Sequence, residues 1–471
     1  MKILLINPPY HKERIFRKSM SEVGALLPPL GLAYIASVLE EKGHTVKIID
    51  GPVLTTKKGY TYRNLKEDLI HFNPSIVGVT ATSPQIRDAI ETINIAKEAD
   101  NNIVTLLGGP HITSLPQILS EIKSLDYGIY GEGEHTFLDI VSRLRSKKKI
   151  KGLKGVIWRE GKKIRYLQRD YILNIDKLPF PARHLLPMNL YRPSPANYRR
   201  LPATQIMTSR GCPYSCVFCH KPIFGKNFRP HSAEWVLAEI EHLINRYGIK
   251  DLQIFDDAFT LDKKRAEDIC SGIIERKLDI VWNCMTRVDR IDENMLRLMK
   301  KAGCYEIGYG VESGSERILK MIKKGITKEK IIEAFALTKK HKIDIRAFFM
   351  IGFPTETRRD ILDTISFAKK LNPDVAQFMV TTPYPDTELW EMCKKYGQIN
   401  IGDWSNFTFY APQSAPFVPF SLKKNEIEEL YLKAIKSFYF RPKFILNQLL
   451  KIKSISDAQR KVIAAKAVLG M

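Results

Sequence analysis

The chain has 471 residues, 44% of them hydrophobic, and because a single hydrophobic core rarely grows this large, we expect two or three domains. Lys and Arg number 74 against 51 Asp and Glu, and the net charge of +23 allows an anionic substrate, a nucleic acid or an anionic membrane surface as partner. The first residues, MKILLINPPY, are unlike a secretory signal and no long apolar run follows, so we expect a cytoplasmic protein. In that reducing compartment, seven cysteines of which three are clustered indicate a metal or catalytic site and exclude a disulfide framework.

The first 150 residues alternate short apolar segments with helical patterns, which is typical of a parallel α/β sheet. Five segments are expected to be strands: KILLIN (2–7), HTVKIID (44–50), SIVGVT (75–80), IVTLLGGPH (103–111) and YGIYGEGE (127–134). A doubly wound domain is therefore predicted over residues 1–150. Its ligand should lie beyond the carboxyl ends of the strands.

Polar residues, glycines and prolines gather at those carboxyl ends. They are Asn7 and Pro8; Thr80, Thr82 and Ser83; Gly108 and Gly109; and Glu132. Glycines and prolines also make the ordinary turns of an αβ unit, so one such loop alone would not indicate a site. Four loops at the same edge of one sheet favour a binding site there.

A hairpin, GVIWREGKKIRYL (155–167), and a proline-rich stretch follow, and we interpret residues 151–200 as hairpin and connector. From residue 201, six apolar segments alternate with helical patterns, and because eight such units close a full barrel, six predict a partial (β/α)6 barrel over residues 201–395. The expected strands are TQIMTS (204–209), DLQIFDD (251–257), DIVWNCMT (279–286), CYEIGYGVES (304–313), DIRAFFMIGFP (344–354) and DVAQFMVTTP (374–383). Residues 396–471 are predicted to form a basic helical region.

The sequence RGCPYSCVFCH (210–220) directly follows the first of these strands and holds Cys212, Cys216 and Cys219. A structural zinc site uses four ligands, commonly in two pairs, whereas the other four cysteines of the chain are single and scattered. Thiolates suit iron–sulfur clusters, and a cubane held by three cysteines leaves one iron with an open coordination position. The motif therefore indicates a cluster with a vacancy for chemistry.

CPYSCVFC matches the Cys-x3-Cys-x2-Cys signature of radical S-adenosylmethionine (SAM) enzymes, including the aromatic Phe218 before the last cysteine. The resemblance implies a partial barrel in which these cysteines hold a [4Fe-4S] cluster and the open iron chelates SAM. It also implies SAM contacts at Phe218 and at later strand ends: Asp256 or Asp257 in FDDAFT, Glu312 and Ser313 in GVESGSERIL, and Gly352 and Glu356 in FMIGFPTET. FDDAFT lacks the two glycines of the family's motif, so its match rests on the acidic residues alone.

Arg287, in CMTRVD, also ends an expected strand. Its guanidinium could face the carboxylate of SAM, or it could form a surface ion pair with Asp289 or Asp292. The sequence leaves both interpretations open. Tyr384, in TTPYPDTELW, follows the sixth strand at a turn resembling the family's proline–glycine–threonine turn, with Asp386 where glycine is usual.

The N-terminal domain, with its NPP, PPLGLAYIASVLEEKGH, GGPH and GEGEHTF segments, resembles the cobalamin-binding domain of one class of these enzymes. The resemblance extends through about residue 395. It implies cobalamin contacts at the residues that gather at the strand ends: Asn7, Pro8, Thr80, Thr82, Ser83, Gly108, Gly109 and Glu132. The Asp-x-His-x-x-Gly motif that supplies an axial histidine in classical cobalamin enzymes is absent, which implies base-off cobalamin without a histidine ligand.

Together the two resemblances imply a methyltransferase, in which a 5′-deoxyadenosyl radical activates an unreactive carbon and methylcobalamin supplies the methyl group. The same architecture also resembles an anaerobic oxidative cyclase of the Mg-protoporphyrin monomethyl ester type, which is the alternative to a methyltransferase. A radical methylthiotransferase acting on tRNA would carry clustered cysteines in its N-terminal domain, yet all seven cysteines lie at or beyond Cys212, so we expect no nucleic-acid partner. A non-catalytic cobalamin sensor would have no use for the cysteine motif.

The C-terminal segment LYLKAIKSFYFRPKFILNQLLKIKS (430–454) mixes aromatic and aliphatic residues with Lys and Arg. Such a segment either packs its apolar side on the barrel or lies on an anionic membrane surface, and Pro442 argues against one long helical face. Membrane contact would favour a lipid-like substrate over another small molecule. The family resemblance also implies an electron donor such as flavodoxin or ferredoxin.

Overall fold

The N-terminal domain is built on a seven-stranded sheet in the order β2-β1-β3-β4-β5-β6-β7. The structure is a computed structural model that describes residues 1–9, 24–408, 415–452 and 454–469. The strands are β1 (Lys2–Asn7), β2 (Thr45–Asp50), β3 (Ile76–Thr80), β4 (Val104–Gly108), β5 (Tyr127–Ile129), β6 (Val156–Glu160) and β7 (Lys163–Tyr166). Strands β1 to β5 pair in parallel, as expected, and the β6–β7 hairpin extends the same sheet in antiparallel pairing.

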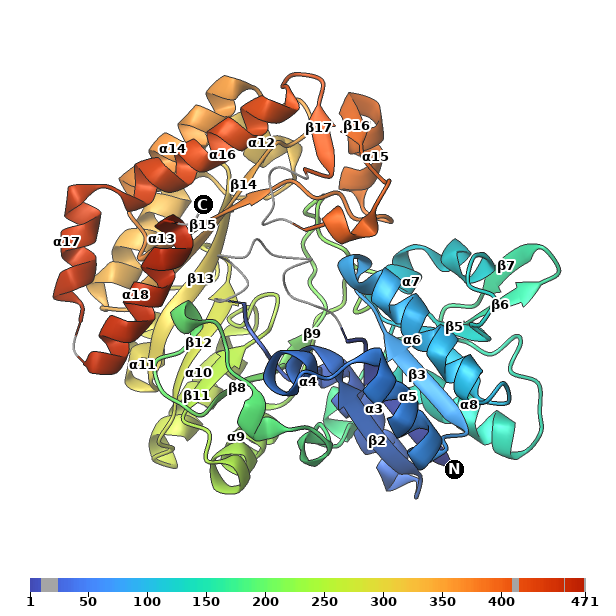
Figure 1. Cartoon of the computed structure of the whole chain (residues 1–471). Coiled ribbons are helices and arrows are strands. Elements are labelled where there is room, and N and C mark those ends of the chain that lie inside the picture. The colour runs from blue at the N-terminus through green and yellow to red at the C-terminus, as the bar shows by residue number, and fades with distance from the viewer. Residues whose placement is uncertain (10–23, 409–414, 453, 470–471) are drawn as a thin grey trace.

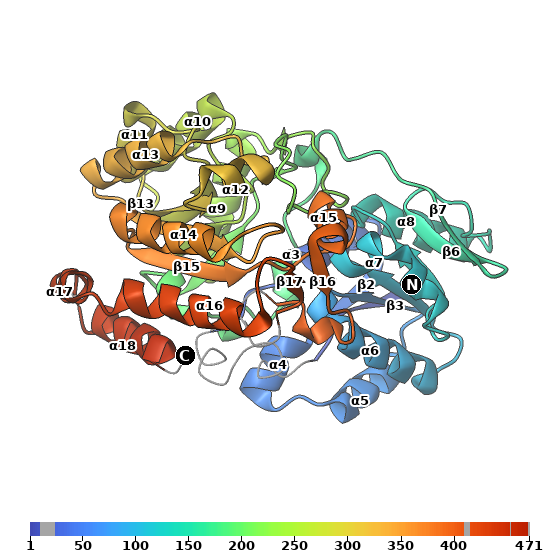
Figure 2. The same ribbon diagram turned by 90° about the horizontal axis from the view of Figure 1, so that it is seen from above.

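Helices lie on both faces of this sheet (Figures 1 and 2). They are α3 (Leu30–Glu41), α4 (Gly51–Lys58), α5 (Tyr62–Phe72), α6 (Ile86–Ala99), α7 (Pro110–Ser114) and α8 (Glu134–Arg145). Strand β1 shows why both faces are covered, because Ile3 and Leu5 belong to one hydrophobic core, and Leu4 and Ile6 belong to the core on the opposite face. The predicted doubly wound fold is confirmed.

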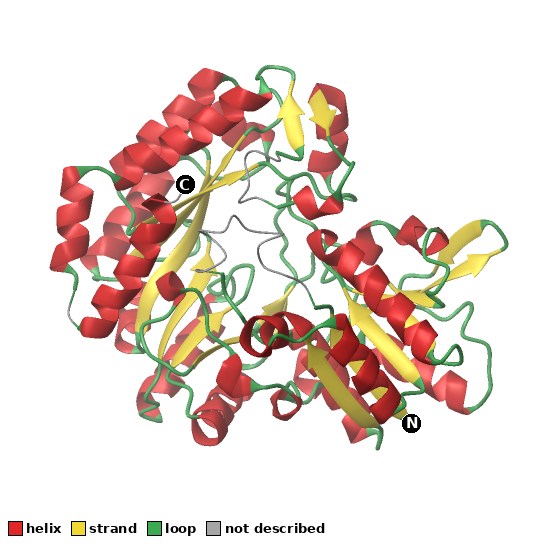
Figure 3. Cartoon of the chain, in the orientation of Figure 1, coloured by secondary structure: helices red, strands yellow, loops and turns green. Residues whose placement is uncertain are grey.

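The second domain is a sheet of six parallel strands in the order β15-β14-β13-β12-β11-β8. Its strands are β8 (Ala203–Ile206), β11 (Asp251–Ile254), β12 (Val281–Thr286), β13 (Cys304–Glu312), β14 (Asp344–Ile351) and β15 (Val375–Val380). The intervening helices are α9 (Ala233–Tyr247), α10 (Lys263–Glu275), α11 (Glu293–Lys301), α12 (Glu316–Met321), α13 (Lys328–Lys340) and α14 (Arg358–Leu371). The sheet curves without closing (Figure 3), which confirms the predicted partial barrel.

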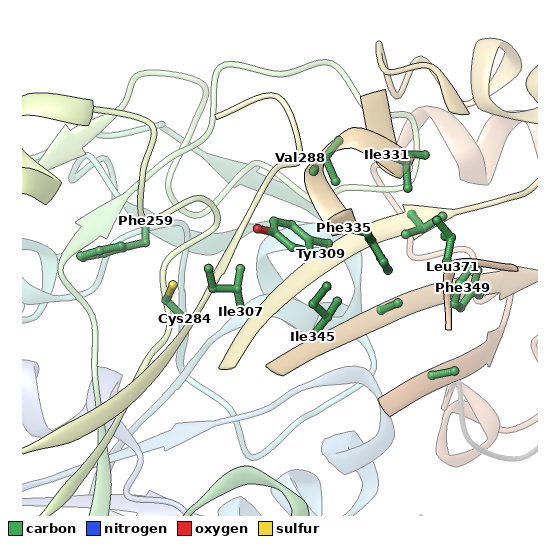
Figure 4. Close-up of a cluster of buried hydrophobic side chains, with 14 of the residues drawn as sticks. Phe259, Cys284, Val288, Ile307, Tyr309, Ile331, Phe335, Ile345, Phe349 and Leu371 are labelled. Atoms are coloured by element: carbon green, nitrogen blue, oxygen red, sulfur yellow. The ribbon is translucent and has the colours of Figure 1, made fainter. Parts of the chain in front are cut away.

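The barrel core lies between the curved sheet and its outer helices. Tyr309 of β13 packs against Phe335 of α13 at a ring-centroid distance of 5.7 Å, and Ile307 and Ile345 lie beside them (Figure 4). On β14, buried and partly buried residues alternate, as expected for a strand with one face in this core. The core fixes the strands whose carboxyl ends carry the motif loops.

The C-terminal region covers the β15 side of the barrel. It comprises α15 (Glu388–Tyr396), β16 (Gly397–Ile399), β17 (Phe417–Pro419), α16 (Lys424–Tyr439), α17 (Pro442–Leu450) and α18 (Ile455–Leu469). Helix α16 lies along β15 and α14 (Figure 2), and the Tyr439 hydroxyl donates to Ala376 O at 2.9 Å. Phe438 and Phe444 are buried, so much of the apolar side of this region packs on the barrel. Within the described ranges, no helix has the length and apolar character needed to cross a bilayer.

Candidate active site

The three clustered cysteines lie in one loop, residues 211–228, whose two ends are joined. Strand β9 (Ser209–Arg210) precedes the loop and pairs in antiparallel fashion with β10 (Arg229–Pro230), which follows it. Gly211 begins the loop with a φ of 83°, and a Cβ atom there would lie 2.2 Å from Asn227 O. Only glycine fits this turn without strain. The paired base and the turn hold the loop at the carboxyl end of β8.

This cysteine loop borders a cavity of about 430 Å³ between the two domains. The N-terminal domain contributes Thr82, Ser83, Pro110 and Ser114 to its wall. The second domain contributes Cys212, Tyr214, Cys216, Cys219, His220, Lys221, Ile223, Phe224, Gly225, Asp257, Arg287, Lys324 and Tyr384. All three predicted cluster cysteines therefore face one space that the predicted cobalamin-binding loops also border.

The thiols of the cysteine loop differ in acidity. The hydrogen bond between the Cys216 and Cys219 thiols lowers the pKa of Cys216 to about 6 and raises the pKa of Cys219, and burial raises the pKa of Cys212. The positive charges of Lys324 and Arg287 also favour the Cys216 thiolate. Thiolates are the form that binds iron. Among the described residues, no three His, Cys, Asp or Glu side chains close on a single metal ion. Binding of a cluster through the three sulfur atoms of the loop stays a prediction.

Arg287 forms the ion pair with Asp289 that was one of the two interpretations the sequence left open, and its contact with SAM stays a prediction. Its guanidinium donates to the Asp289 carboxylate at 2.9 and 3.0 Å and stacks on the Tyr214 ring at 3.6 Å. It is nonetheless buried in the cavity wall. The ion pair with Asp289 thus orients a cation that borders the cavity, and Asp292 caps α11 instead.

Glu312 is a buried carboxylate and not an exposed loop acid. Lys324 Nζ donates to its Oε1 at 2.7 Å, and the two side chains are 7% and 9% exposed. Lys324 also lies 5.7 Å from the centroid of the Phe218 ring and borders the cavity. This buried pair places a second cation beside the cluster loop, and the sequence motifs gave no signal for Lys324.

The two adjacent aspartates of FDDAFT differ in role. The Asp256 carboxylate accepts from Thr208 N, Thr208 Oγ1 and Ser209 N, at 2.7, 2.5 and 3.0 Å, and is buried. Asp257 borders the cavity, where desolvation and the charge of Asp256 raise the pKa of its carboxyl group. Of the two aspartates, Asp257 borders the cavity, whereas Asp256 holds the segment after β8.

The remaining predicted SAM residues lie outside the cavity lining. Ser313 is fully buried and its hydroxyl pairs with Thr364 Oγ1 at 3.1 Å. Glu356 accepts from Gly352 N at 2.6 Å and from Phe353 N at 2.9 Å. Burial raises the pKa of Glu356 to about 8 even though these two donors oppose the shift. Their contact with SAM stays a prediction.

Some of the predicted cobalamin residues border the cavity and others do not. Thr82 and Ser83 border the cavity. The loops beside them are tightly packed, because a Cβ atom on Gly109 would lie 2.8 Å from Thr80 Oγ1. Asn7 donates to Asp50 Oδ1 at 2.8 Å. Pro8, Gly108, Thr80, Gly109 and Asn7 are not in the cavity lining, so their contact with cobalamin stays a prediction.

Glu132 lies away from the main cavity. Its carboxylate accepts from Arg210 at 2.7 Å, from Arg229 at 2.9 and 3.0 Å, and from Ile172 N at 3.0 Å. With these partners it is a buried ion-pair residue between the domains. Its contact with cobalamin stays a prediction.

Several cavity residues were not predicted from sequence. Ser114 is the last residue of α7, and His220 and Lys221 directly follow the last cysteine of the motif. Their positions after GGPH and after Cys219 were the only available signal. Tyr384, which follows the sixth strand, also borders the cavity. Asp386 has a φ of 64°, the conformation that favours the glycine usual at that position in the family.

Comparisons with known proteins agree with this two-domain site. Residues 206–368 match the profile of the Radical SAM superfamily, and residues 17–141 match that of the B12 binding domain. The chain is 40% identical over 455 residues to a protein of Pyrococcus horikoshii named Uncharacterized methyltransferase PH0819, and the alignment covers 95% of each chain. It is 28% identical over 453 residues to the anaerobic magnesium-protoporphyrin IX monomethyl ester cyclase of Rubrivivax gelatinosus, covering 94% of this chain and 78% of the cyclase.

A solved structure shares the whole fold. The radical SAM methyltransferase TsrM from Kitasatospora setae, with cobalamin and a [4Fe-4S] cluster bound, superimposes with a TM-score of 0.75 at 18% identity, covering 100% of this chain and 99% of TsrM. The cofactors that these domains imply, a [4Fe-4S] cluster, SAM and cobalamin, are compatible with the cysteine loop and the cavity described above. The chain belongs to the family of radical SAM enzymes with an N-terminal cobalamin-binding domain.

Proposed function

We propose that the protein is a cobalamin-dependent radical SAM methyltransferase that places a methyl group on an unactivated carbon. The observation that carries this proposal is the shared cavity, whose wall joins the three cluster cysteines to Thr82, Ser83 and Ser114 of the cobalamin-binding domain. When bound, the cluster supplies the electron that cleaves SAM, and cobalamin supplies the methyl group. A substrate bound between the cysteine loop and the cobalamin-binding domain would be accessible to both cofactors.

The residues of this chain would orient the reactants and exclude water. Asp257 would accept from the amino group of SAM, and Arg287, held by Asp289 and Tyr214, would face its carboxylate. Both charged groups lie in a partly enclosed cavity, where electrostatic contacts are stronger than in water. Holding the reacting groups in one geometry is the main contribution that a protein makes to such a reaction.

An oxidative cyclase is the second candidate function. The cyclase of Rubrivivax gelatinosus aligns with 94% of this chain, so the architecture alone does not separate the two reactions. The relative named as a methyltransferase is 40% identical against 28% for the cyclase, and this difference supports methyl transfer. The reactions differ in their products, since methylation adds a labelled methyl group and cyclisation removes hydrogen.

The test is an anaerobic incubation of cluster-reconstituted, cobalamin-loaded protein with methyl-labelled SAM, reductant and a cellular metabolite extract. Mass spectrometry should detect the label on a new carbon of one extract component, together with 5′-deoxyadenosine. An unlabelled product lighter by hydrogen would support the cyclase and contradict methyl transfer.

An external electron donor such as flavodoxin or ferredoxin would reduce the cluster. Such donors are acidic proteins, and the net charge of +23 supports their electrostatic attraction to this chain. Because rim charges act mainly on the association rate, raising the salt concentration should slow reduction by flavodoxin and leave reduction by the small reductant dithionite much less affected. Equal salt dependence for both reductants would contradict the proposal.

We also propose that the C-terminal helices contact an anionic membrane surface. Helices α17 and α18 and the turn between them expose a set of aliphatic side chains: Ile445, Leu446, Leu449, Leu450, Ile452, Ile455, Val462 and Ile463. Exposed apolar side chains gathered on two consecutive helices are typical of an interaction site. Exposed Lys443 and Lys466 lie on the same helices, and Asp457 is the single acidic residue beyond position 440. Aliphatic groups among basic ones fit anionic lipid.

Vesicle binding tests this contact. The double variant Leu449→Asp and Leu450→Asp should lose binding to vesicles that contain phosphatidylglycerol, and Lys443→Glu should weaken it. Leu173→Asp is the matched control, because Leu173 is 77% exposed in a different part of the molecule. If the wild-type protein does not bind these vesicles and instead forms dimers through the exposed aliphatic side chains of α17 and α18, membrane contact is contradicted.

A further inference from the structure

Four charged side chains meet where the two domains join. Arg210 Nη1 lies 2.7 Å from Glu132 Oε1, and Arg210 Nη2 lies 2.6 Å from Glu134 Oε1. Arg229 Nη1 lies 2.9 Å from the same Glu132 oxygen. No member of this group is more than 6% exposed at its side chain. We call Glu132, Glu134, Arg210 and Arg229 the interdomain node.

The two arginines of the node stand at the two ends of the cysteine loop. Arg210 ends β9, two residues before Cys212, and Arg229 begins β10. These two residues pair with each other in the short antiparallel ladder. Both guanidinium groups reach the turn between β5 and α8 in the cobalamin-binding domain, because Glu132 lies in that turn and Glu134 is the first residue of α8. The node therefore ties both ends of the cysteine loop to one place in the other domain.

Further contacts make the node rigid. Arg229 donates to Ile172 O at 2.7 Å and to Phe224 O at 2.9 Å, and Arg210 lies 5.2 Å from the centroid of the Tyr34 ring. The node is electrically balanced, with two guanidinium groups against two carboxylates. Buried ion pairs of this kind add little net stability because their desolvation cost is large. The planar guanidinium group, however, binds carboxylates in a defined orientation, so the pairs fix the relative position of the segments that carry them. This points to a role in geometry.

We propose that the interdomain node positions the cysteine loop against the cobalamin-binding loops and thereby couples cleavage of SAM to methyl transfer. The proposal rests on the proposed methyltransferase function. The node residues do not line the main cavity, so they act as positioning residues. If the node is loosened, SAM can still be cleaved at the cluster, but the activated substrate and the methyl donor no longer meet in the same geometry. A displacement of about 1 Å can cost a reaction roughly 100-fold.

Two variants loosen the node without removing bulk. Arg229→Lys keeps the charge and loses the planar fork, and Glu132→Gln keeps the shape and removes the charge. The matched control is Arg183→Lys, because Arg183 and Glu239 form another buried ion pair, 2.6 Å long with both side chains 1% exposed, that does not border the cavity. All variants are tested as full-length, cluster-reconstituted, cobalamin-loaded protein with iron content measured.

The first readout is the ratio of 5′-deoxyadenosine to methylated product. Both node variants should retain deoxyadenosine formation and raise this ratio at least about 10-fold, whereas Arg183→Lys should leave it unchanged. An unchanged ratio in node variants with full iron content would overturn the proposal. A rise of the same size in Arg183→Lys would also overturn it, since general destabilisation would then explain the effect.

The second readout does not need a methylated product. Microwave power saturation of the cob(II)alamin electron paramagnetic resonance signal, with the cluster oxidised and then reduced, reports how close the two cofactors lie. The node variants should change the relaxation enhancement caused by the reduced cluster, and Arg183→Lys should not. If methyl transfer fails for every protein, this measurement still tests the node, and an enhancement identical to wild type in both node variants would overturn it.

Discussion

The imidazole Nε2 of His220 lies 2.6 Å from the hydroxyl Oγ of Ser114. His220 directly follows Cys219 in the barrel domain, and Ser114 ends α7 in the cobalamin-binding domain. Both border the same cavity, so this hydrogen bond crosses the domain boundary inside the proposed active site. The proposed site therefore belongs to both domains.

Cys216→Ala should abolish the cluster. Three sulfur ligands are the fewest that hold a cubane with one open iron, so the variant should fall well below the roughly four iron atoms per chain of a [4Fe-4S] protein. Iron analysis and the visible absorption spectrum measure this. Cys393→Ala, which removes a buried thiol of α15, should keep its iron, and loss of iron there would show that the effect is not specific to the motif.

Asp257→Asn and Asp256→Asn should have different effects. Asp257 borders the cavity, so its variant should weaken SAM binding, measured by titration calorimetry, with little change in the melting temperature. Asp256 holds Thr208 and Ser209 through three hydrogen bonds, so Asp256→Asn should lower the melting temperature, because a buried acceptor site is replaced by a donor. Equal loss of SAM affinity in both would contradict these separate roles.

Lys324→Met should destabilise the fold strongly. The substitution leaves the Glu312 carboxylate buried without its 2.7 Å partner, and such a loss costs about 3–5 kcal/mol of unfolding free energy. Lys323→Met is the control in the neighbouring position, because the Lys323–Glu388 pair is exposed and should cost less than about 1 kcal/mol. Denaturant unfolding gives both values, and similar costs for the two variants would argue against a buried ion pair.

Glu356 should make stability depend on pH. Its pKa is about 8 in the folded state against 4.5 as the ordinary value, so between these values the folded protein holds a proton that the unfolded chain has released. Unfolding free energy should therefore fall as pH rises from about 5 to 8, by up to about 1.4 kcal/mol per pH unit. Glu356→Gln mimics the protonated carboxyl and should flatten this slope. An unchanged slope in the variant would assign the dependence to another group.

The cysteine motif could be predicted because Cys212, Cys216 and Cys219 all lie within eight consecutive residues. The six strands of the barrel could be predicted from the hydrophobic periodicity of their sequences. The fold class was confirmed for the same reason.

Other site features depend on tertiary packing and could not be predicted. Asp256 and Asp257 are adjacent in the loop after β11, and the path of that loop, which the sequence did not reveal, decides which of them faces the cavity. Glu132 was expected to contact a cofactor because it lies at a strand end. In the structure it forms buried ion pairs with Arg210 and Arg229, which lie about 80 and 100 residues later in the sequence. Lys324 reaches Glu312 only because of the path of the chain after α12.

The central claim is that one cavity joins SAM cleavage to methyl transfer onto carbon. The most direct test is to incubate the loaded protein anaerobically with methyl-labelled SAM, reductant and metabolite extract, and to follow both the label and 5′-deoxyadenosine by mass spectrometry. We predict a labelled carbon product and deoxyadenosine together, with both absent in Cys216→Ala. Deoxyadenosine that forms without any labelled product would contradict it.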